Sequence, residues 1–361
     1  MKSPRRLGLL ALWIAVLLAL PELAGYTAFK VLGLKPLGSY GYPNGLYAPH
    51  PELGYLYTPN FSGTFSGTAF AEVRLQINSY GFRDRPFGTK NPTRKRLIVL
   101  GDSVVFGSGV SVGQRFTEML AQAALPGTAP EVLNLGVNKY TFGHYLTIAR
   151  LDFMGLDPEA VLVGFTLNDI ANKVDPGPEW DIASTPQATT PGWRTRFNDW
   201  RRHTYTDKLW QELRNYAKTA AMSQAEKEEY YTKWMRSVVR YWQQERPRQR
   251  LAQELAAFKE LMTARGTPYG FLLFPELNDL MYPGRFSLPR ESAIGMFREL
   301  EIPYCEIHPF FGRSQDLRSL FLPGDSVHFT EAGHRLVAEA VADCISQGKI
   351  SLDAPVPSRR H

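Results

Sequence analysis

The sequence predicts an α/β protein with three layers, in which helices cover both faces of a parallel β-sheet. Five short segments are apolar almost throughout, which is typical of strands buried on both faces; they are residues 97–100, 131–137, 160–166, 268–274 and 302–307. Segments with helical periodicity lie between them, and this alternation is the pattern of a parallel sheet. The chain has 361 residues, of which 44% are hydrophobic, so it can bury a sizeable core.

The segment 1–37 is interpreted as a membrane anchor. Lys and Arg residues within the first six positions precede an unbroken apolar run over residues 7–20, which is typical of an export signal. No small-x-small cleavage site follows, which favours an uncleaved, single-pass anchor in the cytoplasmic membrane, with the rest of the chain on the exported side. Pro21 and Glu22 interrupt the run. Secretion after cleavage is therefore the alternative.

Residues 38–94 predict a small β-rich accessory segment. Gly, Pro and aromatic residues are frequent there, and this composition suits short strands and turns. Polarity alternates over residues 71–78, with the apolar side formed by Ala71, Val73, Leu75 and Ile77. This alternation predicts a half-buried antiparallel strand.

The main domain is expected over residues 95–348, and its first strand delivers Asp102 and Ser103 at the carboxyl end. Open α/β sheets hold their ligands at that edge, so Ser103 is a candidate nucleophile. Taken alone the Gly-Asp-Ser triplet is a weak signal, because ordinary residue usage produces it in about one chain in ten of this length. The stretch "GDSVVFGSGVSVG" fits neither G-x-G-x-x-G nor a P-loop, which argues against nucleotide binding.

The next two strands end at Gly136 and just before Asn168. A glycine lets its backbone N–H approach a ligand, and an asparagine amide donates hydrogen bonds, so both are candidate oxyanion donors. Each could also be an ordinary turn or capping residue. Their position on the edge that also carries Ser103 favours the functional interpretation.

An insertion is predicted over residues 171–247, between the third and fourth strands. It begins with a Pro-rich loop and continues as helix, where Ser223 and Glu226 have the spacing of a capping box. Six of the seven tryptophans fall between Trp180 and Trp242. The favoured interpretation is that they pack an inserted helical subdomain. The alternative is that some line a substrate groove, because such an insertion overhangs the ligand edge of the sheet.

Near the carboxyl end, Asp325 and His328 stand three residues apart, before a helix that Thr330 caps. A carboxylate this close can fix the tautomer of the imidazole, which is the role of the acid in a catalytic triad. His334 is interpreted as a helix-surface residue, and His308 is kept as a spare candidate base. Residues 349–361 are interpreted as a tail.

The two cysteines, Cys305 and Cys344, lie in an apolar strand and on the apolar face of a helix. Two buried thiols are the favoured interpretation. A disulfide is the alternative, because an exported domain would meet an oxidising compartment.

Over residues 95–346 the chain resembles the SGNH/GDSL hydrolase superfamily. That family carries Ser in a Gly-Asp-Ser block, Gly in a second block, Asn in a third and Asp-x-x-His in a fourth. The sequence has these blocks in family order as "GDSV", "NLG", "TLND" and "DSVH", which hold Ser103, Gly136, Asn168, Asp325 and His328. Val104 stands where the family name has Leu, and Thr166 stands where the third block usually has Gly. The resemblance implies a flavodoxin-like three-layer fold.

The resemblance also implies a serine esterase. In that mechanism Ser103 attacks an ester, His328 is the base, and Asp325 orients it; the N–H groups of Ser103 and Gly136 and the amide of Asn168 form the oxyanion hole. No metal or organic cofactor is needed. The expected substrate is an ester on a carbohydrate or a lipid, with carbohydrate O-acetyl or O-acyl groups preferred. An O-acetyltransferase that modifies an exported polysaccharide and a non-catalytic binding module are the alternatives.

The formal charge of +6 is modest for this length, and the basic residues are spread among acidic ones. This distribution argues against a nucleic-acid partner.

Overall fold

The computed structural model describes most of the chain outside the Pro-rich loop and the ends. The described residues are 4–32, 43, 45–67, 70–123, 130–171, 193–194, 197, 200–201 and 204–353. The chain divides into two compact units. The smaller unit comprises residues 1–41, 66–72 and 188–230, and the larger unit comprises residues 42–65, 73–187 and 231–361.

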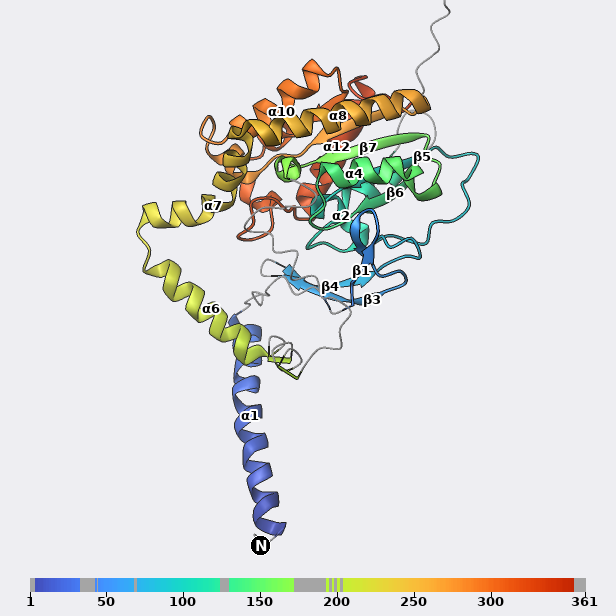
Figure 1. Cartoon of the computed structure of the whole chain (residues 1–361). Helices are drawn as coiled ribbons and strands as arrows, with labels where there is room; N and C mark the ends of the chain where they lie inside the picture. The colour runs from blue at the N-terminus through green and yellow to red at the C-terminus, as the bar shows by residue number, and fades with distance from the viewer. Residues whose placement is uncertain are drawn as a thin grey trace, which may run out of the picture. The chain divides into compact units, whose positions relative to one another are not determined.

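A five-stranded parallel sheet forms the centre of the larger unit (Figure 1). Its strands are β5 (Arg96–Gly101), β6 (Glu131–Gly136), β7 (Ala160–Phe165), β8 (Tyr269–Leu273) and β9 (Tyr304–Glu306). They lie in the order β6-β5-β7-β8-β9, the order of flavodoxin-like sheets. Every residue of β5 and β7 is buried, which explains their uniformly apolar sequences. The predicted α/β class and all five predicted strands are confirmed.

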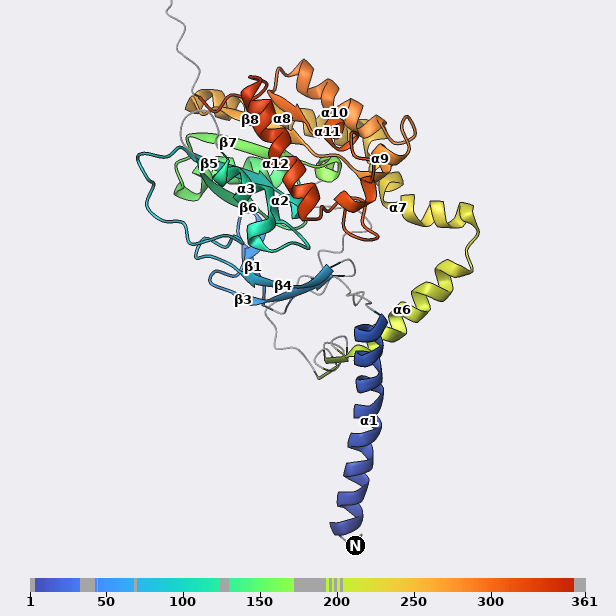
Figure 2. The ribbon, with the colours of Figure 1, turned by 180° about the vertical axis from the view of Figure 1, so that it is seen from behind.

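Helices cover both faces of this sheet, as Figures 1 and 2 show from opposite sides. On one face α4 (Phe142–Arg150) packs on α8 (Glu245–Arg265), and on the other α3 (Phe116–Gln122) packs on α12 (Glu331–Ser346). The remaining helices of the larger unit are short or peripheral; they include α2 (Ser103–Phe106), α9 (Leu277–Met281), α10 (Leu288–Glu299) and α11 (His308–Phe311). The three-layer prediction is confirmed.

Short 3₁₀ helices complete the connections. They are η1 (Val112–Gln114), η2 (Asp152–Gly155), η3 (Leu167–Ile170) and η5 (Leu317–Leu320).

The β-rich segment forms two small sheets. In one, β1 (Tyr47–His50) pairs antiparallel with β2 (Gly54–Tyr57), and in the other β3 (Ser62–Gly67) pairs with β4 (Phe70–Gln76). Val73, Leu75 and Ile77 are buried while the residues between them are exposed, as the alternation predicts. Asn78 breaks the pattern because it is buried. Its Oδ1 accepts hydrogen bonds from the backbone of Tyr80 (3.0 Å) and Phe82 (3.1 Å) and so organises the following turn.

The insertion contains α6 (Tyr205–Ala220) and α7 (Gln224–Gln243). The predicted capping box is present: Ser223 N donates to Glu226 Oε2 at 2.7 Å, and Glu226 N donates to Ser223 Oγ at 3.3 Å. The Pro-rich loop, residues 172–190, and Trp180 lie outside the described residues.

The tryptophans of the insertion do not share one environment. Trp242 is 1% exposed and its Nε1 donates to Leu167 O at 2.7 Å, so it packs as predicted. Trp193, Trp200 and Trp210 are 73%, 56% and 65% exposed. For these three the favoured interpretation, packing inside a helical subdomain, is wrong, because no core of the described residues covers them.

A disulfide joins Cys305 and Cys344, whose Cα atoms are 5.9 Å apart. The favoured interpretation as two free thiols is therefore wrong. Both residues lie in the core, where α12 packs against the outermost strand β9, so the bridge fixes the last helix to the sheet.

The first helix, α1, spans Pro4–Leu32 and belongs to the smaller unit. The sequence predicts a membrane anchor in this region. Among the residues that the structure describes, no helix has both the length and the apolar character needed to cross a membrane.

Candidate active site

Ser103 is the first residue of α2, immediately beyond the carboxyl end of β5. The turn between them is fixed by Asp102, whose Oδ1 accepts a hydrogen bond from Val104 N at 2.9 Å and so caps the helix. Gly101 permits this sharp turn, because a Cβ there would lie 2.1 Å from Val105 Cγ2. The serine is therefore held by backbone geometry at the edge where sheets of this type hold ligands.

His328 and Asp325 meet Ser103 at this edge, as the sequence predicts. His328 Nε2 lies 2.8 Å from Ser103 Oγ, and His328 Nδ1 lies 2.7 Å from Asp325 Oδ2. The second carboxylate oxygen, Asp325 Oδ1, accepts hydrogen bonds from Val327 N (2.8 Å) and His328 N (3.0 Å). The three side chains form an unbroken hydrogen-bonded line from hydroxyl to carboxylate, the geometry of a nucleophile, a base and its orienting acid.

The electrostatics of this pair suit an imidazole that accepts a proton. Burial opposes a charge on His328, but the carboxylate of Asp325 outweighs it, and the net effect raises the pKa of His328. The pKa of Asp325 is lowered, because the neighbouring His328 and its hydrogen bonds outweigh the opposing effect of burial. Asp325 therefore stays ionised and favours the imidazolium that forms when His328 takes a proton.

If His328 is the base that deprotonates Ser103 in an ester hydrolysis, we expect the rate to fall as the pH falls, with a midpoint above 6.5, the ordinary pKa of histidine. Only neutral His328 can accept the proton of Ser103, and its raised pKa keeps it protonated to a higher pH. A profile of kcat/KM against pH measures the midpoint. In Asp325→Asn the residual activity should show a midpoint shifted to lower pH. An unshifted midpoint would mean that Asp325 does not set the pKa of the base.

Asn168 lies in η3, beyond the carboxyl end of β7, and is joined to the serine turn through Asp102. Asn168 Nδ2 lies 3.5 Å from Asp102 Oδ2, and Thr166 Oγ1 donates to the same oxygen at 3.0 Å. Thr166 stands where the third block of the SGNH/GDSL pattern usually has Gly. Its hydroxyl helps to hold the carboxylate of Asp102 in place. One amide hydrogen of Asn168 faces Asp102, which leaves the other available to a ligand.

Gly136 ends β6 beside the first strand, where Gly101 is its register partner. Its N–H donates to Asn134 Oδ1 at 2.9 Å. The structure thus brings Gly136 to the expected edge with its N–H already paired inside the protein. Close packing explains why this residue is a glycine: a Cβ at position 136 would lie 2.2 Å from Phe106 N, in the backbone of α2.

Arg83 is a residue that sequence analysis missed. Its guanidinium is buried and donates to the carbonyl oxygens of Phe106 (3.1 Å), Gly107 (2.8 Å) and Val110 (2.8 Å), at the end of α2. The neighbouring Asp84 accepts from Asn134 N at 2.8 Å. Arg83 and Asp84 therefore tie the segment before β5 to the end of α2 and to β6. The only signal in the sequence was an adjacent charged pair, Arg83 and Asp84, in the turn that follows the alternating strand.

Glu276 was also missed, and it lies beyond the carboxyl end of β8. It is 2% exposed, and the next residue, Leu277, donates its N–H to Ser326 O at 2.9 Å, in the loop that carries Asp325 and His328. Burial and the nearby carboxylates of Asp279 and Asp325 raise the pKa of Glu276 to about 8. At neutral pH the carboxyl group of Glu276, next to the loop that contains Ser326, is therefore mostly uncharged.

Two other histidines are placed apart from this arrangement. His334 is 1% exposed and its ring stacks on Phe116, so the interpretation as a surface residue is wrong. Burial lowers the pKa of His334 to about 3, and it stays neutral. His308 Nε2 lies 3.5 Å from Asp279 Oδ2, next to Arg290 rather than Ser103. Across the described residues no three His, Cys, Asp or Glu side chains are grouped to hold a metal ion.

No family model matches the sequence, and no curated protein is significantly similar to it. Solved structures do resemble it. A lipase/acylhydrolase from Enterococcus faecalis shares 10% identity, with 72% of this chain and 100% of the other covered and a TM-score of 0.39. A member of the lipolytic protein G-D-S-L family from Veillonella parvula shares 12% (70% and 99% covered, TM-score 0.37), and a GDSL-like lipase from Bacteroides thetaiotaomicron shares 12% (72% and 92%, TM-score 0.36). Likeness this distant says nothing of what this chain does.

Proposed function

We propose that the protein is a serine ester hydrolase of the SGNH type. The observation that carries this proposal is the line from Ser103 Oγ through the ring of His328 to Asp325, with distances of 2.8 and 2.7 Å. Ser103 and His328 are 225 positions apart in the chain, yet their side chains are in contact. Acyl transfer through a serine requires this sequence of hydroxyl, imidazole and carboxylate.

In the proposed reaction Ser103 Oγ attacks the ester carbonyl while His328 Nε2 takes its proton. The resulting tetrahedral intermediate collapses when His328 gives that proton to the leaving alcohol, and the acyl group remains on Ser103. Water, deprotonated by His328, then attacks the acyl-serine, and the second tetrahedral intermediate releases the acid when His328 returns that proton to Ser103 Oγ. Asp325 keeps the imidazole oriented and favours its charged form throughout.

The developing oxyanion needs hydrogen-bond donors. Ser103 begins α2, where backbone N–H groups have no acceptor within the helix, and the Asn168 amide has one hydrogen directed away from Asp102. Gly136 can take part only by sharing its N–H with Asn134 Oδ1. We therefore propose Ser103 and Asn168 as the principal donors, each worth about 3 kcal/mol of the barrier, with Gly136 as the third.

For the substrate we propose an ester carried by a carbohydrate, with O-acetyl or other short O-acyl groups. We also propose that the protein acts outside the cytoplasm. The basic and apolar start of the sequence supports this location, and so does the Cys305–Cys344 disulfide, because such bonds persist in oxidising compartments. Acylated glycans are esters that an exported hydrolase could reach.

The proposal is tested with nitrophenyl esters of increasing acyl length and with acetylated glycans, on which free acetate is measured. We expect turnover of acetyl and other short esters and release of acetate from glycan. Fast hydrolysis of long acyl esters alone would replace the carbohydrate with a lipid ester. Acetyl transfer to a glycan faster than acetate release would identify an acyltransferase. Failure of folded protein to react with a fluorophosphonate at Ser103 would contradict the enzyme altogether.

A further inference from the structure

We infer that the smaller unit binds the surface of an anionic lipid bilayer through one side of α6. This side, called here the α6 lipid face, consists of Trp210, Leu213, Arg214 and Ala217. The inference is independent of the chemistry at Ser103, and it explains the exposed aromatic residues of the insertion, which the proposed esterase does not use.

The α6 lipid face is a continuous helical stripe. Its members are three or four positions apart, so they lie on the same side of the helix, and all four are exposed. Trp210 is 65% exposed and Leu213 is 54% exposed. Earlier in the same unit Trp193, Phe197 and Trp200 are more than half exposed as well. Large apolar side chains exposed side by side, as Trp210 and Leu213 are along this stripe, mark a binding site for a protein or a membrane.

A specific attachment holds α6 on α1 (Figures 1 and 2). The carboxylate of Glu22 accepts hydrogen bonds from Tyr205 N (2.6 Å), Thr206 N (3.1 Å) and Thr206 Oγ1 (3.1 Å), at the first turn of α6. The rings of Tyr26 and Tyr205 meet edge to face with their centroids 5.1 Å apart. The backbones approach closely at Gly25, where a Cβ would lie 2.9 Å from Tyr205 C. Glu22 thus caps α6 from the first helix and explains a charge in an otherwise apolar segment.

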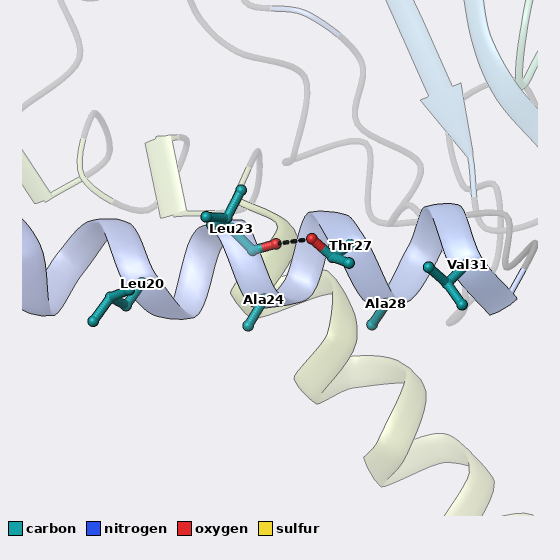
Figure 3. A pocket seen from close by; sticks show the side chains of 6 residues that line it. All are labelled: Leu20, Leu23, Ala24, Thr27, Ala28 and Val31. Atoms are coloured by element: carbon teal, nitrogen blue, oxygen red, sulfur yellow. Dashed lines mark hydrogen bonds between the residues drawn. The ribbon is translucent and has the colours of Figure 1, made fainter.

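The first helix adds apolar surface to the same unit. Figure 3 shows an open groove along it, lined by Leu20, Leu23, Ala24, Thr27, Ala28 and Val31. The single hydroxyl there is satisfied, because Thr27 Oγ1 donates to Leu23 O at 2.8 Å. Leu20, Leu23 and Val31 are each more than half exposed. A lipid surface is a partner that could cover the exposed side chains of both helices.

The excess of basic side chains in this part of the smaller unit favours an anionic lipid bilayer over an uncharged apolar partner. Residues 193–220 contain seven Lys and Arg against three Asp and Glu. Arg214 lies within the α6 lipid face, and the guanidinium of Arg194 stands 5.4 Å from the centre of the Trp193 ring. Tryptophan beside arginine is the combination found where a helix lies in the headgroup region, with the apolar rings below and the cations near phosphate.

The test places a fluorescent probe on the α6 lipid face of the full chain. Because both native cysteines are bonded to each other, Leu213→Cys supplies a unique free thiol for a nitrobenzoxadiazole label. The matched control is Thr263→Cys, exposed on α8 in the larger unit. Both proteins are reconstituted with phosphatidylglycerol-rich or phosphatidylcholine vesicles that contain lipids with a nitroxide quencher.

We expect the emission at position 213 to shift to the blue and to be quenched at least about two-fold more in phosphatidylglycerol-rich vesicles than the emission at position 263. Adding Arg214→Glu should weaken this difference, and Ser103→Ala should leave it unchanged, so a failed esterase proposal and a failed membrane proposal give different results. Equal quenching at the two positions would overturn the inference. So would a shift produced by a second copy of the chain or by a glycan in the absence of lipid.

Discussion

Replacing Ser103 with alanine should reduce kcat/KM for a short-chain ester by about 10⁴-fold or more. The reason is that His328 Nε2 then has no hydroxyl to deprotonate, and the covalent route through an acyl-serine is lost. The side chain is small and lies at the start of a helix, so the fold should persist, as circular dichroism of the variant can verify. Steady-state kinetics on the substrate that the wild-type protein prefers measures the loss.

The matched control for this variant is Ser111→Ala, because Ser111 is an exposed serine in the loop that follows α2. We expect it to keep nearly full activity and to react with a fluorophosphonate, whereas Ser103→Ala should not react. If Ser103→Ala hydrolysed esters at the wild-type rate, the hydroxyl that contacts His328 would have no part in the chemistry.

Removal of the disulfide should lower the free energy of unfolding by about 4 kcal/mol, from the loss of a loop constraint in the unfolded chain. The two cysteines are separated by 39 positions, and both are at most 1% exposed, so the double variant Cys305→Ala/Cys344→Ala also loses core contacts. Denaturant titration of the wild type with and without a reductant isolates the effect of the bond itself, because no side chain is then replaced. Equal stability of the oxidised and reduced protein would contradict this expectation.

The same bond also tests the proposed location. Because both cysteines are buried, the thiols are trapped by acid quenching of intact cells and alkylated in denaturant; Cys305 and Cys344 should then stay unmodified if the larger unit is exported, and be modified if it stays in a reducing compartment. Protein found fully alkylated and folded in cells would argue against export.

The parts of the molecule that depend on short local patterns could be predicted from the sequence. Strands buried on both faces leave uninterrupted apolar runs, and parallel strands bring their carboxyl ends to one edge, so the placement of Ser103 and Asn168 at that edge followed from position. The approach of His328 to Ser103 was expected only from the family resemblance. Asp325 and His328 share one loop, and their contact needed no knowledge of the remaining fold.

The disulfide and the pairing of the Gly136 N–H could not be predicted, because they depended on distances or on competition between hydrogen bonds. No periodicity could show that β9 and α12 bring two cysteines within bonding distance. The use of the Gly136 N–H by Asn134 was hidden because both residues read as ordinary members of an apolar strand. His334 is different, since the helical spacing of Val337, Val341 and Cys344 already placed it on the buried side of α12. That signal was present and was outweighed by the usual preference of histidine for surfaces.

The capping of α6 by Glu22 has a consequence for how such a chain evolves. The two partners are 183 positions apart, and each depends on the other: without α6 the carboxylate would lose its amide donors in a mostly apolar stretch of α1, and without Glu22 the first amides of α6 would lose their acceptor. The N-terminal helix and the inserted helix are therefore expected to be inherited as a pair. A descendant that lost one should soon replace Glu22 or discard the other.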